Sequence, residues 1–154
     1  MTYPIDLPTE QASEQWARRL ATCLTAPLTL TFSGDIGAGK TTLIRATLRA
    51  LGITAPIKSP TFSLVESYQI DRMRLHHFDL YRIHEASELE YIGFRDYFTS
   101  NAVCCIEWPE RAQMCLALAD VGFTLNINGP GRQMHARAYS PAGASMLSSL
   151  LGES

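Results

Sequence analysis

Gly34-Asp-Ile-Gly-Ala-Gly39-Lys40-Thr41 decides the fold of this sequence, because it matches the pattern GxxxxGK followed by Ser or Thr. Its glycines let backbone N–H groups curl around an anion without obstruction by a Cβ atom. A β-rich run, residues 27–33, precedes the loop, and a helix is expected from residue 40 to about 51, closed by Gly52. Strand, loop and helix stand in the order that phosphate binding requires, so a chance match is a poor alternative.

The residue types in the loop assign roles in binding a nucleotide. Lys40 is expected to reach the β- and γ-phosphates, and Thr41 to offer its hydroxyl to Mg²⁺. Thr42, one position further along, is placed to donate to the α-phosphate. The predicted contacts include the rest of the loop, with no separate chemical role for its second and third residues: Gly34, Asp35, Ile36, Gly37, Ala38 and Gly39.

Hydrophobic periodicity predicts the remaining elements. They are an amphipathic helix over residues 9–24 with Thr9 as N-cap, strands 61–70 and 73–81 forming a hairpin, a helix over 85–91, a buried parallel strand 102–106, strands 121–127 and 133–139, and a terminal helix from Pro141. The expected fold class is α/β, with one P-loop ATPase domain over residues 1–154. Its sheet is expected to be mixed and mainly parallel, with an antiparallel hairpin and flanking helices.

Two carboxylates are candidates for the chemistry around a magnesium ion. Glu107 ends the buried strand 102–106, where open α/β sheets place their ligands, so it is predicted to bind the metal with Thr41. The alternative is a solvated glutamate that faces elsewhere. Asp79 shares a strand face with His77 and is placed to orient water or hold a metal-bound water, although a structural His–Asp hydrogen bond explains the pair equally well. Lys40, Asp79 and Glu107 are the candidate catalytic residues.

Two further side chains near these carboxylates have open interpretations. Trp108 is placed to pack over the nucleotide or to meet a partner, and core packing is the alternative. Arg82 offers positive charge for phosphoryl transfer, but a surface ion pair with Glu85 or Glu88 is the simpler expectation.

The composition excludes several classes of protein. A formal charge of −2 provides no bulk basic field for gripping nucleic acid. The 4 cysteines include no CxxC pair, so neither a disulfide framework nor a zinc site is indicated. No apolar run approaches the roughly 20 residues of a membrane span, and a cytoplasmic protein with no membrane contact is expected.

Three motifs beyond the loop carry a family resemblance: Ser59-Pro-Thr-Phe62, His77-Phe-Asp-Leu-Tyr-Arg82 and Ile106-Glu-Trp-Pro-Glu110. With them the sequence resembles the TsaE (formerly YjeE) family, bacterial P-loop ATPases needed to make threonylcarbamoyladenosine in tRNA. The resemblance implies ATP and Mg²⁺ as cofactors, Glu107 as a metal ligand, and residues 59–62, Thr61 included, as a switch-like segment near the γ-phosphate. It also implies that Glu10 and Arg132 flank the base.

The same resemblance implies protein partners. Family members look like accessory ATPases that attach to TsaD and TsaB, the pair that transfers the threonylcarbamoyl group. Contact with tRNA is therefore expected to be indirect, and hydrolysis by the isolated chain slow.

The sequence is also compatible with three other functions. A small-molecule kinase would use Asp79 as a base on a substrate hydroxyl, but no arginine-rich lid segment is evident. A GTPase is disfavoured, because the guanine-reading pattern (Asn/Thr)-Lys-x-Asp is missing and no aspartate has glycine three positions later. A nucleotide-sensing binding module with incidental hydrolysis is the third possibility.

Overall fold

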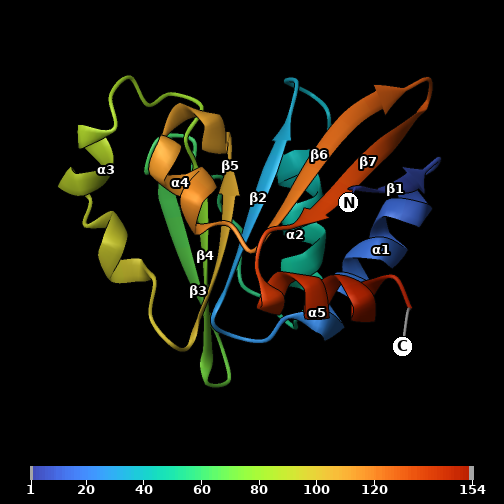
Figure 1. Ribbon diagram of the computed structural model, residues 1–154, viewed down its shortest axis with the longest axis horizontal. Helices are drawn as coiled ribbons and strands as arrows, with labels where there is room; N and C mark the ends of the chain where they lie inside the picture. Colours follow the sequence, from blue (N-terminus) through green and yellow to red (C-terminus); the bar gives the residue numbers. More distant parts are fainter. Residues whose placement is uncertain (1, 153–154) are drawn as a thin grey trace.

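The computed structural model describes residues 2–152 and folds them around one seven-stranded sheet (Figure 1). The strands are β1 (Thr2–Leu7), β2 (Leu28–Gly34), β3 (Val65–Ile70), β4 (Met73–Asp79), β5 (Ala102–Glu107), β6 (Val121–Asn128) and β7 (Gly131–Ala138). The α-helices are α1 (Glu10–Cys23), α2 (Lys40–Ala50), α3 (Ser87–Tyr91), α4 (Gln113–Leu118) and α5 (Pro141–Leu150), and two 3₁₀ turns cover Phe94–Tyr97 and Pro109–Arg111.

The strand order is β1-β7-β6-β2-β5-β4-β3. The four central strands, β6, β2, β5 and β4, pair in parallel. Antiparallel strands complete both edges, with β3 on β4 at one side and β7 and β1 beyond β6 at the other. The predicted α/β class, the mixed sheet with its parallel core and the β3–β4 hairpin are therefore confirmed.

The structure corrects three details of the sequence-based elements. β1 was not predicted, because its sequence TYPIDL is short and contains a proline, which edge strands tolerate. The hairpin strand β3 begins at Val65 rather than at residue 61, since the four residues before it form a turn that ends with Leu64 in a left-handed conformation, φ 68°. α4, one and a half turns long, was also missed, being too short to show a periodicity.

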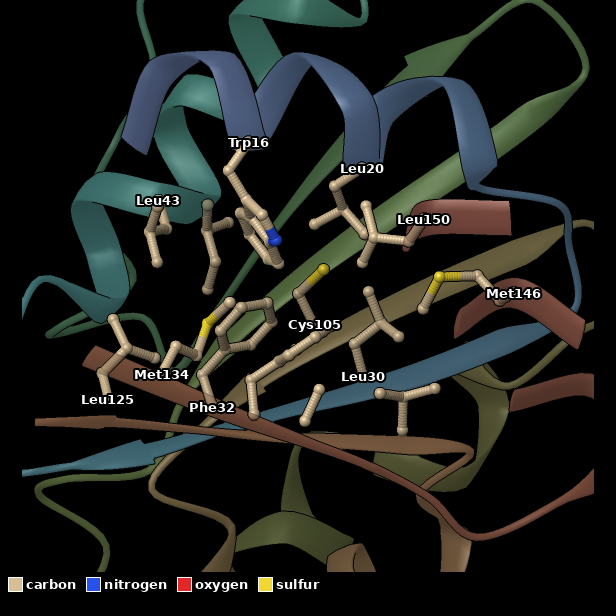
Figure 2. Close-up of a cluster of buried hydrophobic side chains, with 14 of the residues drawn as sticks. Trp16, Leu20, Leu30, Phe32, Leu43, Cys105, Leu125, Met134, Met146 and Leu150 are labelled. Atoms are coloured by element: carbon tan, nitrogen blue, oxygen red, sulfur yellow. The ribbon is translucent and has the colours of Figure 1, made fainter. Parts of the chain in front are cut away.

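Two hydrophobic clusters cover the two faces of the sheet. On one face α1, α2 and α5 pack Trp16, Leu43 and Met146 against the strands around Phe32 (Figure 2). On the other face α3 and α4 cover a smaller cluster that includes Phe78 and Ile106. β5 lies between the clusters and is buried along its whole length, which explains its continuous apolar sequence.

The parallel core brings three functional segments to one edge of the sheet. β2 leads into the glycine-rich loop, β4 ends at Asp79 and β5 ends at Glu107, and Glu107 lies opposite both Phe32 and Asp79 in the strand register. β6 comes so close at this edge that a Cβ atom on Gly34, whose φ is 137°, would lie 2.3 Å from the carbonyl oxygen of Leu125. Only glycine fits there, so the loop's first residue is fixed by tertiary packing as well as by its own turn.

Candidate nucleotide-binding site

A cavity of about 540 Å³ opens at the carboxyl edge of the parallel strands, within the size range of small-molecule sites. It is lined by residues from the glycine-rich loop, the start of α1, the ends of β4 and β5, and the turn between β6 and β7. The predicted site residues on its wall are Glu10, Ile36, Gly37, Ala38, Gly39, Lys40, Thr41, Thr42, Thr61, Asp79, Glu107, Trp108 and Arg132. Segments distant in sequence thus converge on one cavity.

Gly34 and Asp35 do not line this cavity, unlike the rest of the loop. Their backbone carbonyls instead accept hydrogen bonds from Nζ of Lys40, at 2.5 Å and 2.9 Å. The Lys40 side chain is 4% exposed, and burial is the largest influence on its pKa, which lies below the ordinary lysine value. The side-chain nitrogen of Lys40 is therefore hydrogen-bonded to the backbone of the loop, beside the position where phosphates are expected.

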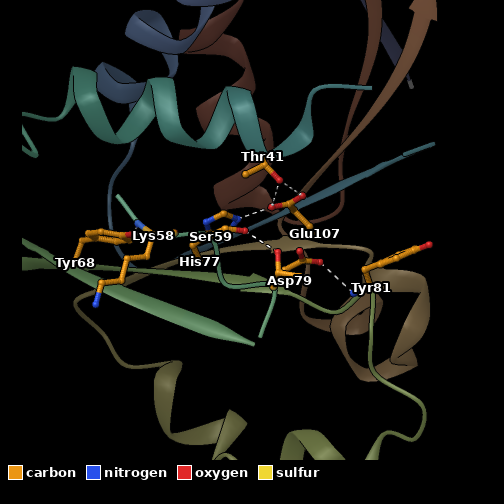
Figure 3. Close-up of polar contacts among 9 residues, drawn as sticks. Thr41, Lys58, Ser59, Tyr68, His77, Asp79, Tyr81 and Glu107 are labelled. Atoms are coloured by element: carbon orange, nitrogen blue, oxygen red, sulfur yellow. Dashed lines mark hydrogen bonds and ion pairs between the residues drawn. The ribbon is translucent and has the colours of Figure 1, made fainter. Parts of the chain in front are cut away.

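Glu107 lies beside the N-terminus of α2 and contacts Thr41 directly (Figure 3). The Thr41 hydroxyl lies 2.8 Å from Oε1 and 2.9 Å from Oε2 of the carboxylate and donates to it. Glu107 is only 2% exposed, so the alternative of a solvated strand-end glutamate is wrong. The two oxygen ligands predicted for magnesium are adjacent in space although they are 66 residues apart in sequence.

These oxygens suit magnesium, which prefers one or two protein oxygens and completes its shell with water and phosphate. Within residues 2–152 no group of three or more His, Cys, Asp or Glu side chains is arranged to hold a metal ion. The donor set therefore fits a nucleotide-bound Mg²⁺ better than a metal ion enclosed by protein ligands alone.

Asp79 ends β4 beside Glu107 and is 9% exposed. Its Oδ1 accepts a hydrogen bond from the backbone N–H of Tyr81 at 3.1 Å. Burial raises the pKa of this carboxyl, and the neighbouring Glu107 charge raises it further. The suggested His77–Asp79 hydrogen bond is not formed, because Nε2 of His77 lies 2.6 Å from Oε2 of Glu107 instead.

Trp108 is half-buried on the cavity wall, in a left-handed conformation with φ 58°. Nζ of Lys40 lies 4.3 Å from the centroid of its ring, and the centroid of the Tyr81 ring lies 4.9 Å from the same centroid. Core packing therefore accounts for only part of this side chain, whose ring also borders the loop lysine. The sequence could not show this contact, because it depends on the backbone turn after β5.

Arg132 projects from β7 onto the glycine-rich loop. Its Nε donates to the carbonyl of Ala38 at 3.0 Å and one terminal nitrogen to the carbonyl of Gly37 at 3.3 Å. Glu10, the first residue of α1, borders the same end of the cavity. A contact of either residue with the base stays a prediction. The hydrogen bonds of Arg132 show a second role, which is to hold the carbonyl groups of the glycine-rich loop.

The segment expected to act as a switch lies at the cavity rim. Thr61 lines the cavity, and the hydroxyls of Ser59 and Thr61 are 2.7 Å apart. Phe62 is 86% exposed, and the Arg82 guanidinium lies 5.0 Å from its ring centroid. A surface ion pair of Arg82 with Glu85 or Glu88 was expected. In the described part of the chain no such ion pair is formed, so that expectation was wrong. Movement of this segment remains a prediction.

Helices of the described residues are too short or too polar to cross a membrane.

Comparisons with known proteins identify the family of this chain. The family model for "Threonylcarbamoyl adenosine biosynthesis protein TsaE" matches residues 7–137. The tRNA threonylcarbamoyladenosine biosynthesis protein TsaE of Haemophilus influenzae is 41% identical over 116 residues, which is 75% of this chain and 73% of that protein. The protein of the same name from Aquifex aeolicus is 32% identical over 117 residues, covering 75% and 83% of the two chains.

A solved structure shares the fold. The crystal structure of YdiB from Bacillus subtilis superposes with a TM-score of 0.75 and covers 99% of this chain and 94% of its own. Because the sequence identity is 23%, this likeness supports the arrangement of strands and helices only.

Proposed function

The chain belongs to the TsaE family of threonylcarbamoyl adenosine biosynthesis proteins, and from that membership we propose that it binds and hydrolyses ATP with Mg²⁺ as an accessory protein in threonylcarbamoyladenosine modification of tRNA. The observation that supports the nucleotide chemistry best is the contact of Thr41 with Glu107 at the start of α2. A P-loop hydroxyl and a strand-end carboxylate are the pair that holds nucleotide-bound magnesium in enzymes of this class.

The polar residues at the phosphate end of the cavity each have a part in this proposal. Lys40 leaves the carbonyls of Gly34 and Asp35 and donates to β- and γ-phosphate oxygens, while the backbone N–H groups at the N-terminus of α2 receive the same anion. Mg²⁺, when bound, neutralises charge on the phosphates. Asp79, on the same cavity wall, orients the attacking water in this proposal, because Glu107 already accepts hydrogen bonds from two side chains.

We further propose that TsaD and TsaB are the partners. The family resemblance suggests them, and three apolar side chains around the cavity give a partner something to cover: Ile36 is 67% exposed, Phe62 86% and Tyr81 36%. The two arginines that line the cavity are engaged elsewhere, Arg82 over the Phe62 ring and Arg132 on the loop carbonyls, so slow hydrolysis by the isolated chain is expected. In other P-loop enzymes an arginine supplied by a partner raises turnover by about 10³–10⁵.

The test measures phosphate release by the purified chain with and without the TsaB–TsaD pair, and partner affinity in a non-hydrolysable ATP analogue and in ADP. We expect the pair to accelerate release, and tighter docking in the ATP analogue. By linkage, docking must then strengthen ATP binding by the same factor. Fast turnover alone, with no partner effect and equal affinity in both nucleotides, would contradict the proposal.

A small-molecule kinase and a nucleotide sensor remain the alternatives, and product analysis separates them. Phosphate release without a phosphorylated acceptor excludes the kinase. Nucleotide-dependent docking without any turnover favours the sensor.

A further inference from the structure

His77 is a buried polar side chain that has no role in the proposed function. It lies on β4 and is 0% exposed. In the strand register it lies opposite Cys105, two residue pairs before Asp79 and Glu107. Its ring reaches diagonally toward the carboxyl edge of β5, where Nε2 lies 2.6 Å from Oε2 of Glu107 (Figure 3).

The fold alone does not call for histidine at this position. Nδ1 of His77 is buried and finds no hydrogen-bond partner within residues 2–152. An unsatisfied buried nitrogen destabilises the folded state, so an apolar side chain of similar size would suit the sheet better. Within the described residues the polar contact of His77 is the one with Glu107, and this contact accounts for a histidine at the position.

The carboxylate of Glu107 is held from two directions. Thr41 donates its hydroxyl from the start of α2, 2.8 Å from Oε1 and 2.9 Å from Oε2. His77 donates to Oε2 from β4, because a nitrogen at 2.6 Å from a carboxylate oxygen carries the hydrogen of that bond. A free carboxylate rotates about its side-chain torsions, whereas one bonded to a rigid strand has a single orientation.

We propose that His77 is the positioning residue for Glu107: by donating from Nε2 to Oε2, it fixes the carboxylate beside the Thr41 hydroxyl so that the two bind a magnesium ion together. This inference rests on the proposed function of the site. Partners behind a metal-binding carboxylate act in this way in other proteins, where their removal weakens metal affinity by about 10–100-fold. His77 itself touches neither nucleotide nor metal.

A purely structural role is the competing explanation, in which the hydrogen bond merely ties β4 to β5. His76 provides a matched control. It is the next residue on the same strand, is 4% exposed, and is bonded through Nδ1 to the Ser67 hydroxyl at 2.7 Å, on the opposite face of the sheet. Loss of its contact perturbs the strand without touching Glu107.

The experiment compares His77→Leu, His77→Gln and His76→Gln with the unaltered chain. The Mg²⁺ concentration for half-maximal strengthening of ADP binding is titrated by calorimetry, ADP affinity is measured in a metal chelator, and thermal unfolding is recorded. Glutamine places its amide nitrogen as many bonds from Cα as Nε2 of histidine and still donates a hydrogen bond.

We expect His77→Leu to raise the required Mg²⁺ about 10–100-fold while metal-free ADP affinity changes less than threefold. His77→Gln should recover at least part of the shift, and His76→Gln should leave the Mg²⁺ titration unchanged. An unshifted titration in folded His77→Leu, or an equal shift in His76→Gln, would overturn the inference. If His77→Leu does not fold, the inference is decided by His77→Gln against His77→Asn, whose shorter amide cannot reach Glu107 and should show the shift.

Two controls separate this inference from the proposed function. If the unaltered chain fails to bind ADP, or binds it without any influence of Mg²⁺, the proposed function itself fails and the inference with it. If Glu107→Gln shifts the Mg²⁺ titration and His77→Leu does not, the proposed function stands and only the positioning role of His77 is refuted.

Discussion

Replacing Lys40 with methionine tests the assignment of the nucleotide site most directly. Methionine keeps nearly the length and volume of the lysine side chain but removes the charge and all hydrogen-bond donors. Lys40 is 4% exposed, and its Nζ donates to the carbonyls of Gly34 and Asp35 and lies 4.3 Å from the Trp108 ring centroid. The substitution therefore removes one buried cation from the wall that is expected to face the phosphates.

The size of the effect follows from what the cation is bonded to in each state. Truncating one partner of a buried, hydrogen-bonded charge pair costs about 2–5 kcal/mol. At 1.4 kcal/mol for each factor of ten, Lys40→Met should weaken ATP binding by roughly 30-fold to 4,000-fold. Without nucleotide the loss is smaller, because burial lowers the pKa of Lys40 and so already disfavours its charged form.

The unliganded variant should therefore differ from the parent chain by less than about 2 kcal/mol in unfolding free energy, at about 2–4 °C of melting temperature per kcal/mol. Calorimetric titration with ATP and Mg²⁺ gives the affinity, and thermal unfolding without nucleotide gives the stability. A folded variant with unchanged ATP affinity would refute the site assignment. A large stability loss would refute the view that this lysine is held for the ligand rather than for the fold.

Two further predictions concern the metal ligand and the thiols. Glu107→Ala should raise the Mg²⁺ requirement for nucleotide binding more than it weakens metal-free binding, since a hard cation loses an anionic oxygen; identical Mg²⁺ titrations would make Glu107 an ordinary buried residue. Iodoacetamide at pH 8 should alkylate only Cys23 in the native chain and all 4 cysteines after unfolding, counted by mass spectrometry. Burial raises the pKa of Cys104 and Cys115 to about 12, which leaves only about 1 in 10⁴ of each as reactive thiolate, and raises that of Cys105 as well. Rapid native labelling of these three would contradict their burial.

The sequence by itself determined the local elements around the phosphate loop. The pattern from Gly34 to Thr41, preceded by a β-rich run and followed by an amphipathic segment, predicted β2, the loop and α2 within one or two residues. The apolar run 102–106 predicted a buried strand, and Glu107 was assigned from its place after that run. These features are encoded in neighbouring residues, because side-chain periodicity and backbone sterics act over a few positions of the chain.

Only the tertiary structure decided which distant residues meet. The strand order sets β5 beside β2, and this brings Glu107 to Thr41 across 66 positions. The same sheet turns His77 toward Glu107 rather than Asp79, and carries Arg132 from β7 onto the loop carbonyls. No local pattern contains these contacts, because strand pairing and side-chain direction are settled by the packing of the whole sheet against its helices, and that packing depends on every element at once.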